Sequence, residues 1–239
     1  MKPSFVPRLN RADVLLLIGL DDELSWLPGL LEVASNPKIL PGQRGHIDCS
    51  LGVPVAEGPR VLDRSEGDLH PKGNPHYLLD PVHTKIAAQN IAAGLSRNSP
   101  QHQQAFDKKL KAYTAELDTW IARWEKMAAP LKGVKFVEYH QEWVYFANRF
   151  GLKRIASVEI KPGIEPTPNH IVNLVQQIKQ EKIPVLLYGA QNPRIPQQLS
   201  NETGIKILRL YSSAGGRPET DTYIKWIDYT VRTLVQSVS

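Results

Sequence analysis

The chain has 239 residues and a formal net charge of +5, and 41% of its residues are hydrophobic, which is typical of a globular protein with one large domain or two small ones. Lysine and arginine are scattered, without a run of five like charges, so we expect a solvated basic surface and no nucleic-acid partner. The single cysteine, Cys49, excludes an intramolecular disulfide and a cysteine-based zinc site. No apolar run reaches transmembrane length.

The first hundred residues predict few regular elements. The apolar run Val14–Gly19, which ends in glycine, predicts a buried strand, and Ser25–Pro28 starts a short helix. Residues 36–75 are rich in proline and glycine and show no period, which indicates an irregular insertion. Within it, residues 45–48 and 60–63 predict a small ribbon.

A long helix is predicted in the middle of the chain. Pro81–Leu95 is helical, and Ser99 and Pro100 supply a cap and a first-turn proline for a second helix that ends near Pro130. Its apolar residues recur every three or four positions, and about 28 residues span about 42 Å. Such a helix either connects two lobes or is a plain core helix.

After this helix, strands and helices alternate. We expect strands at 134–139, 155–160, 185–188 and 205–210, and helices at 143–150, 168–181, 196–202 and 222–238. Thr167 is a predicted helix cap, and Gly204 stands where a helix would end. A βαβαβαβα order predicts an α/β fold with a parallel sheet, whose ligands bind beyond the carboxyl ends of the strands.

These strand ends carry the candidate metal ligands. His140 follows the first strand and Glu159 lies at the end of the second, and both types of side chain can bind a cation. A lone histidine at a strand end is more often structural than a ligand, so hydrogen-bonded packing of His140 is the alternative. The third strand ends at Tyr188 and Gly189, and the fourth at Tyr211, Ser212 and Ser213.

The loop Gly67–Pro81 is the second candidate region. Its glycine, asparagine and proline residues fix a non-repeating backbone, which would hold His76 at a set angle as one of several metal ligands. His70 is either a bystander or a weaker second contact. Asp68 and Asp80 form a possible acid–base pair, but Asp80 precedes a proline at a helix start and fits a cap better.

Several stretches together resemble a known family. The stretches are Gly73–Pro81 (GNPHYLLDP), Tyr139–Gly151 (YHQEWVYFANRFG) and Glu159–Pro168 (EIKPGIEPTP), with the long helix between the first two. They are similar to the metal-specific solute-binding proteins of bacterial ABC importers, the zinc and manganese group. The similarity covers nearly the whole chain from about Lys2.

The resemblance implies two α/β lobes, each a parallel sheet with flanking helices, joined by one long rigid helix. The lobes would span residues 1–98 and 131–239, with residues 99–130 connecting them. It implies four metal ligands between the lobes, of which His76 matches the second and His140 the third. Two histidines favour Zn²⁺ over Mn²⁺, whose sites are richer in carboxylate.

The function implied is that of a periplasmic zinc-binding component, not an enzyme. It would capture the metal between its lobes and deliver it to an ABC permease in the inner membrane, as a monomer. The alternatives are a metal-binding adhesin or metallochaperone on the same fold, or a metal-dependent hydrolase. Against the hydrolase, the usual hydrolase motifs are absent, and Glu142, the nearest possible base, is expected to face away from His140 or to pack near the helix start.

Two departures from the family pattern are visible. The first ligand histidine would lie upstream of Met1, together with a signal peptide, so we expect an incomplete N-terminal lobe. The usual fourth ligand is an aspartate after the last strand, where this chain has Ser212 and Ser213. Glu159, water or an open position would then complete the site.

Overall fold

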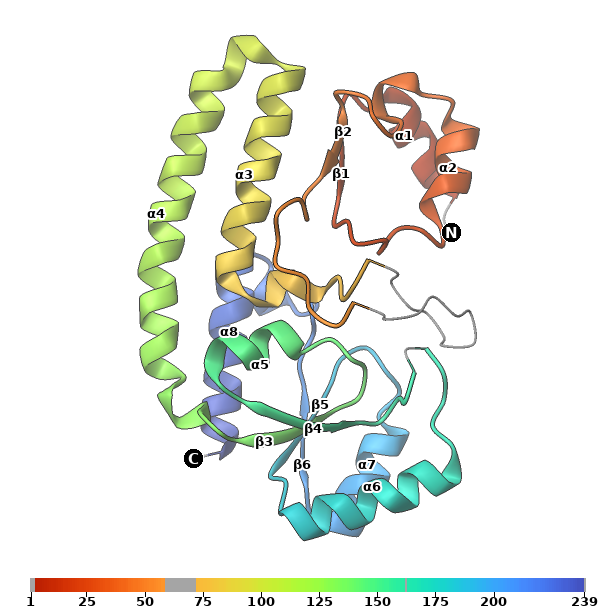
Figure 1. Ribbon diagram of the computed structural model, residues 1–239, viewed down its shortest axis with the longest axis vertical. Helices are drawn as coiled ribbons and strands as arrows, with labels where there is room; N and C mark the ends of the chain where they lie inside the picture. The colour runs from red at the N-terminus through yellow and green to blue at the C-terminus, as the bar shows by residue number, and fades with distance from the viewer. Residues whose placement is uncertain (1–2, 59–71, 162, 239) are drawn as a thin grey trace. The chain divides into compact units, whose positions relative to one another are not determined.

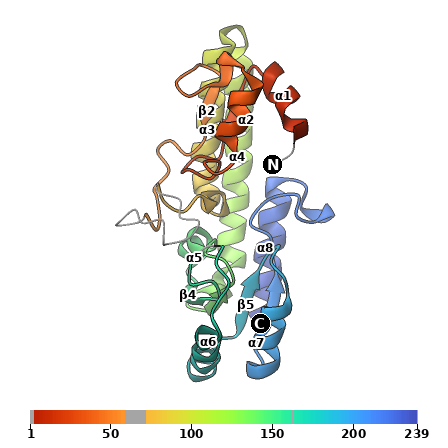
Figure 2. The same ribbon diagram turned by 90° about the vertical axis from the view of Figure 1, so that its right-hand side faces the viewer.

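The computed structural model describes residues 3–58, 72–161 and 163–238, which form two compact units. The described part of the first unit is residues 3–58, 72–77 and Pro81–Asp118, and that of the second is Leu78–Asp80, 119–161 and 163–238. Figures 1 and 2 show their elements. Among the described helices, none combines the length and the apolar character that a membrane crossing requires.

The first unit contains a two-stranded parallel sheet. Strand β1 (Leu15–Leu17) pairs with β2 (His46–Asp48), and Leu16 lies opposite Ile47. Of the two stretches expected to form a ribbon, residues 46–48 pair with β1, and residues 60–63 lie outside the described part of the chain, so the ribbon stays a prediction. A strand forms within the predicted stretch Val14–Gly19, but it is limited to Leu15–Leu17 and is not buried throughout, since Leu16 is 47% exposed.

Helices cover both faces of this sheet. Helices α1 (Val6–Arg11) and α2 (Leu27–Ala34) lie on one face, where α2 packs with β1 and Ile39 in a small apolar core. On the other face lies α3 (Pro81–Asn98), and its Gly94 stands directly against the side chain of Ile47. Short 3-10 turns connect the elements of the chain, at η1 (Pro3–Phe5), η2 (Pro37–Ile39), η4 (His76–Leu79), η5 (Pro100–His102), η6 (Ala129–Leu131) and η7 (Pro218–Thr220).

The long helix is α4 (Gln103–Met127), which begins in the first unit and ends in the second. Ser99 does not cap it as expected. The turn η5 comes between them, and the Ser99 side chain makes no capping hydrogen bond at φ −137° and ψ 72°. The domain boundaries expected near residues 98 and 131 stay a prediction.

The second unit contains the predicted parallel sheet. Its strands are β3 (Lys135–Glu138), β4 (Lys153–Ser157), β5 (Val185–Tyr188) and β6 (Lys206–Arg209), in the spatial order β4-β3-β5-β6. All three strand pairs are parallel, which confirms the α/β class. The carboxyl ends of the four strands therefore lie along one edge.

Two pairs of helices cover this sheet. Helices α6 (Pro168–Glu181) and α7 (Arg194–Thr203) pack against the face that carries Val137 and Leu186. Helices α5 (Val144–Phe150) and α8 (Tyr223–Val238) lie on the other face (Figure 1). The predicted caps are confirmed, because Thr167 Oγ1 accepts a hydrogen bond from the His170 amide and Gly204 ends α7 at φ 75°.

Candidate metal centre

The polar edge of the second unit's sheet holds His140, two residues beyond β3. Its ring Nδ1 lies 2.7 Å from Oε2 of Glu159, which follows β4, and their side chains are 22% and 12% exposed. A carboxylate only accepts hydrogen bonds, so Nδ1 carries the proton, and in the neutral imidazole Nε2 then holds the lone pair that can coordinate a metal. This carboxylate–histidine arrangement is the usual outer support of a metal-bound imidazole.

Glu159 is itself held in place. Its Oε2 also accepts from the Gly163 amide at 3.1 Å, and its own amide donates to the Tyr139 carbonyl at 2.9 Å. Burial lowers the pKa of His140, but the hydrogen bond to Glu159 and the charge of Glu142 outweigh it, so the pKa is raised above the ordinary 6.5. Because Oε2 of Glu159 accepts the hydrogen bond from Nδ1 of His140, Glu159 orients the imidazole ring.

Glu142 lies at the same edge and is almost fully buried, with 4% of its surface exposed. Its amide donates to the His140 carbonyl at 2.8 Å, which closes a three-residue turn. Its carboxylate is hydrogen-bonded by the Ser212 side chain and acts electrostatically on His140. Of the two expected placements of Glu142, packing near the helix start agrees with the structure, because its buried carboxylate lies near Trp143, which directly precedes α5.

The surroundings of the Glu142 carboxylate are incomplete. Its Oε1 is buried without a hydrogen-bond partner, and so is Nε1 of Trp143. The Trp143 indole lies near enough to favour the ionised carboxylate, although it makes no hydrogen bond of good geometry. Burial raises the pKa of Glu142, and the Ser212 hydrogen bond and the charge of His140 oppose this shift.

Glu138, the last residue of β3, differs from Glu142 in that both of its buried carboxylate oxygens accept hydrogen bonds. It is fully buried, but Arg154 Nη1 donates to its Oε1 at 2.9 Å and Ser157 Oγ donates at 3.1 Å. Its Oε2 accepts from the Trp143 amide at 3.0 Å. Glu138 is thus a satisfied structural carboxylate that ties β3 to β4 and to the start of α5.

His76 belongs to the first unit, at the start of η4. Its amide donates to Asn74 Oδ1 at 3.0 Å, and Asn74 is buried and donates to Glu57 Oε2 at 3.0 Å. The next residue, Tyr77, is fully buried and donates to the Ile18 carbonyl at 2.8 Å. These bonds fix the backbone on both sides of His76, whose side chain is half-buried.

Asp80 has a larger role than the helix cap expected for it. It directly precedes α3, and its two carboxylate oxygens accept from Nε and Nη2 of Arg149 at 2.8 and 3.0 Å. Asp80 is 4% exposed. The predicted partner Asp68 lies outside the described residues, as does His70.

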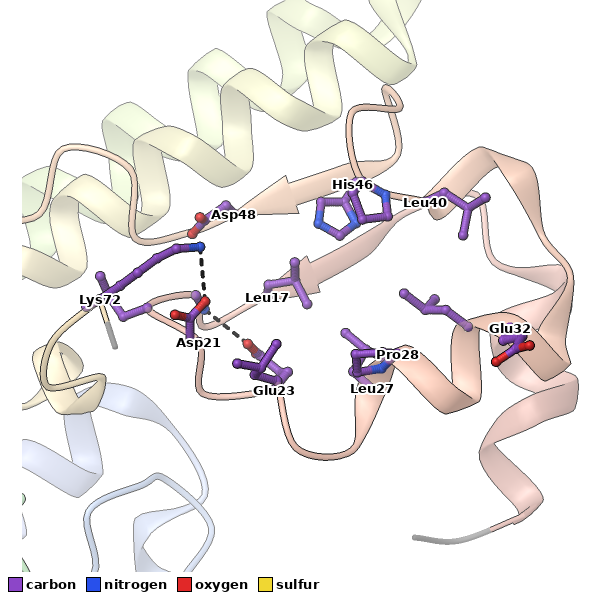
Figure 3. A pocket seen from close by; sticks show the side chains of 15 residues that line it. Leu17, Asp21, Glu23, Leu27, Pro28, Glu32, Leu40, His46, Asp48 and Lys72 are labelled. Carbon is purple, nitrogen blue, oxygen red and sulfur yellow. Dashed lines mark hydrogen bonds and ion pairs between the residues drawn. The ribbon is translucent and has the colours of Figure 1, made fainter. Parts of the chain in front are cut away.

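A separate cavity of about 530 Å³ lies in the first unit, beside β1 and α2 (Figure 3). Its walls include Leu17, Leu27 and Leu31. Two of its acidic groups have partners, since Asp21 pairs with Lys72 at 3.0 Å and Glu23 accepts from the Ile18 amide at 2.6 Å. These carboxylates therefore support the protein's own structure.

No three histidine, cysteine, aspartate or glutamate side chains of the described residues gather closely enough to hold a metal alone. The structure brings His140, Glu159 and Glu142 to one sheet edge, whereas His76 lies in the other unit. Sequence reasoning missed Glu142 as a site residue. The signal in the sequence was a carboxylate between His140, at the end of a strand, and the apolar and aromatic run Trp143–Ala147 (WVYFA).

Comparison with known proteins gives a family match over nearly the whole chain. The model of the family described as zinc-uptake complex component A, periplasmic (ZnuA), matches residues 1–237. The high-affinity zinc uptake system protein ZnuA of Brucella abortus (strain 2308) is 37% identical over 107 residues, which are 44% of this chain and 31% of the relative. The aligned stretch thus spans less than a third of that relative's length.

A longer alignment links the chain to the manganese ABC transporter substrate-binding lipoprotein PsaA of Streptococcus pneumoniae serotype 4. It is 26% identical over 248 residues, covering 99% of this chain and 76% of the relative. A crystal structure of ZnuA covers 100% of this chain and 84% of its own, with a TM-score of 0.82 and 23% identity. A mutant laminin-binding adhesin from Streptococcus agalactiae gives a TM-score of 0.79 at 22% identity, covering 100% of this chain and 86% of its own. These two structures show the fold.

Proposed function

Because the chain belongs to the zinc-uptake complex component A family, we propose that it is the periplasmic zinc-binding component of an ABC import system. The observation that carries the proposal is the hydrogen bond between His140 Nδ1 and Glu159, which places the lone pair of the neutral imidazole on Nε2, the atom that would bind the metal. The protein acts as a binding protein and not as an enzyme, and the metal is its cargo.

We propose His140 and His76 as two of the ligands, one from each unit. Each is held by its own surroundings, His140 by Glu159 and His76 by the backbone bonds of its loop. Ligands that are already ordered leave little entropy for the metal to remove, which favours tight binding. Two neutral imidazoles suit Zn²⁺ better than Mn²⁺, so zinc is the proposed cargo and manganese the weaker competitor.

The proposed partner is a membrane permease, to which the zinc-loaded protein would deliver the metal. We propose that the protein is a monomer. Light scattering behind a sizing column checks the monomer, which has a mass of 26.8 kDa. The likeness to an adhesin supports the fold alone, at 22% identity. Importer function is therefore preferred over adhesion.

Titration of the metal-free chain with zinc tests the ligand assignment. We expect His140→Ala and His76→Ala each to weaken zinc binding, and the double variant to abolish the specific site. His102→Ala is the matched control, since His102 is an exposed histidine in the turn η5, directly before the long helix. Zinc affinity of the double variant equal to that of the control would reject the two ligands.

A further inference from the structure

The Glu142 carboxylate is the least satisfied polar group at the sheet edge of the second unit. It is 4% exposed, and its Oε1 has no hydrogen-bond partner. Leaving a buried acceptor without a donor carries a desolvation cost, so such a group calls for an explanation. Glu138 shows that this chain satisfies a buried glutamate fully where the role is structural.

The position of this oxygen is set by three strand ends. Glu142 follows β3, Ser212 beyond β6 hydrogen-bonds its carboxylate, and a side chain added at Gly189 beyond β5 would place its Cβ 3.5 Å from Oε1. Glycine at position 189 therefore leaves space next to the unpaired oxygen. The turn from His140 to Glu142 keeps both residues beyond the carboxyl end of β3, and each charge acts on the other.

We propose that Glu142 is a carboxylate ligand of the metal ion bound by His140, with Oε1 as the donor atom. This inference rests on the proposed function. A metal ion supplies the positive partner that Oε1 lacks, at the usual zinc–oxygen distance of about 2.0–2.2 Å. Ser212 then acts as a positioning residue, because its hydroxyl holds the carboxylate from the side of β6.

The competing interpretation is that Glu142 stays a neutral, buried carboxylic acid with a packing role only. The two interpretations differ in what glutamine does at this position. Glutamine keeps the shape and satisfies the site at least as well in the metal-free protein, but it removes the anionic oxygen that a metal requires. A purely structural role therefore predicts unchanged zinc binding, and a ligand predicts a large loss.

The experiment is a zinc competition titration of the 239-residue chain against a chromophoric chelator. We expect Glu142→Gln to weaken zinc binding by about 100-fold or more, since even an outer-shell partner of a metal ligand is worth about 10- to 100-fold. Glu165→Gln is the matched control, because it removes an exposed carboxylate after β4 without touching the proposed ligands. It should bind zinc within about twofold of the unmodified chain.

The visible absorption spectrum of bound cobalt(II) provides a second measurement, which would stay unchanged if Glu142 had a packing role only. The spectrum reports the donor set, so Glu142→Gln should change it and Glu165→Gln should leave it unchanged. The metal-free Glu142→Gln chain should melt no lower than the unmodified chain. If the Glu142→Gln chain melts at a lower temperature, Glu142→Asp is used as the test variant. Aspartate keeps the negative charge but has a shorter side chain, so the carboxylate oxygen lies farther from the metal. We expect this variant to bind cobalt more weakly and to give an altered spectrum.

The outcomes separate the inference from the proposed function. Loss of zinc binding in His140→Ala with unchanged binding in Glu142→Gln overturns the role of Glu142 alone. Unchanged binding in His140→Ala overturns the proposed function as well. An unaltered cobalt spectrum in both Glu142 variants would also reject Glu142 as a ligand.

Discussion

The imidazole Nδ1 of His140 lies 2.7 Å from Oε2 of Glu159, and this contact determines both the orientation and the tautomer of the proposed ligand. In the metal-free protein the contact and nearby acidic charges outweigh the effect of burial and raise the pKa of His140. We predict that Glu159→Gln lowers the pKa of His140, because a neutral amide stabilises the imidazolium less. A ring-nitrogen NMR titration of both chains measures the shift, and equal pKa values would contradict the prediction.

The same contact makes stability depend on pH. A histidine whose folded-state pKa is raised contributes stability that is fully present below its unfolded-state pKa, about 6.5, and is lost as pH rises through the folded-state value. Glu159→Gln should therefore lower the melting temperature of the metal-free protein more at pH 5.5 than at pH 8.5. Thermal melts with a chelator present check the sign.

The ion pair of Asp80 and Arg149 yields a stability prediction. Arg149→Ala leaves the carboxylate of Asp80 buried without its two-pronged partner, so we expect a loss of about 3 kcal/mol in the free energy of unfolding. Arg149→Lys should recover only part of this, because an ammonium group cannot match both oxygens.

Urea denaturation at pH 7 measures these changes. Lys38→Ala is the control, since it breaks an ion pair with Asp13 in which both side chains are about two-thirds exposed. Such surface pairs contribute little to stability. A loss in Arg149→Ala no larger than in this control would show that the buried pair is unimportant.

The close packing of α3 on β2 predicts an unusual effect of alanine. In most exposed helix interiors, alanine in place of glycine stabilises by about 1 kcal/mol. At Gly94 the new Cβ would lie 2.3 Å from Cδ1 of the buried Ile47, so we expect Gly94→Ala to destabilise by about 1–3 kcal/mol. Gly29→Ala in α2 is the control, with open space around it, and should stabilise or be neutral. Equal effects of both substitutions in thermal melts would contradict the packing argument.

Cys49 should be chemically inert in the folded protein. It is 6% exposed, and burial, with smaller contributions from the charges of Asp48 and Glu23, raises its pKa to about 11. Since only the thiolate is nucleophilic, alkylation by iodoacetamide at pH 8 should be slow in the native chain and fast in urea. Comparable rates in the two states would show that Cys49 is accessible.

Local signals in the sequence predicted the second unit well. The bounds of α6 and β5 match exactly, because Thr167 caps the former and a short apolar run makes up the latter. Gly204 ends α7 in the left-handed conformation that glycine favours. Each of these features depends on neighbouring residues only.

The same local signals could not predict contacts between residues that are far apart in the sequence. Strand β2 pairs with β1 across about thirty residues, and a three-residue strand carries too little pattern to identify its partner. Likewise, Ser212 and Glu142 lie seventy residues apart, so their contact was not readable from either neighbourhood. His140 and Glu159 were found because both lie at the ends of predicted strands, and parallel topology brings such ends together.

The most direct test of the account is a crystal of the 239-residue chain grown with one equivalent of zinc and measured on both sides of the zinc absorption edge. The account predicts one strong anomalous peak about 2.0–2.1 Å from Nε2 of His140, with His76 and Glu142 also coordinated. A strong peak away from His140, or none in a chain that has bound zinc in solution, would contradict it.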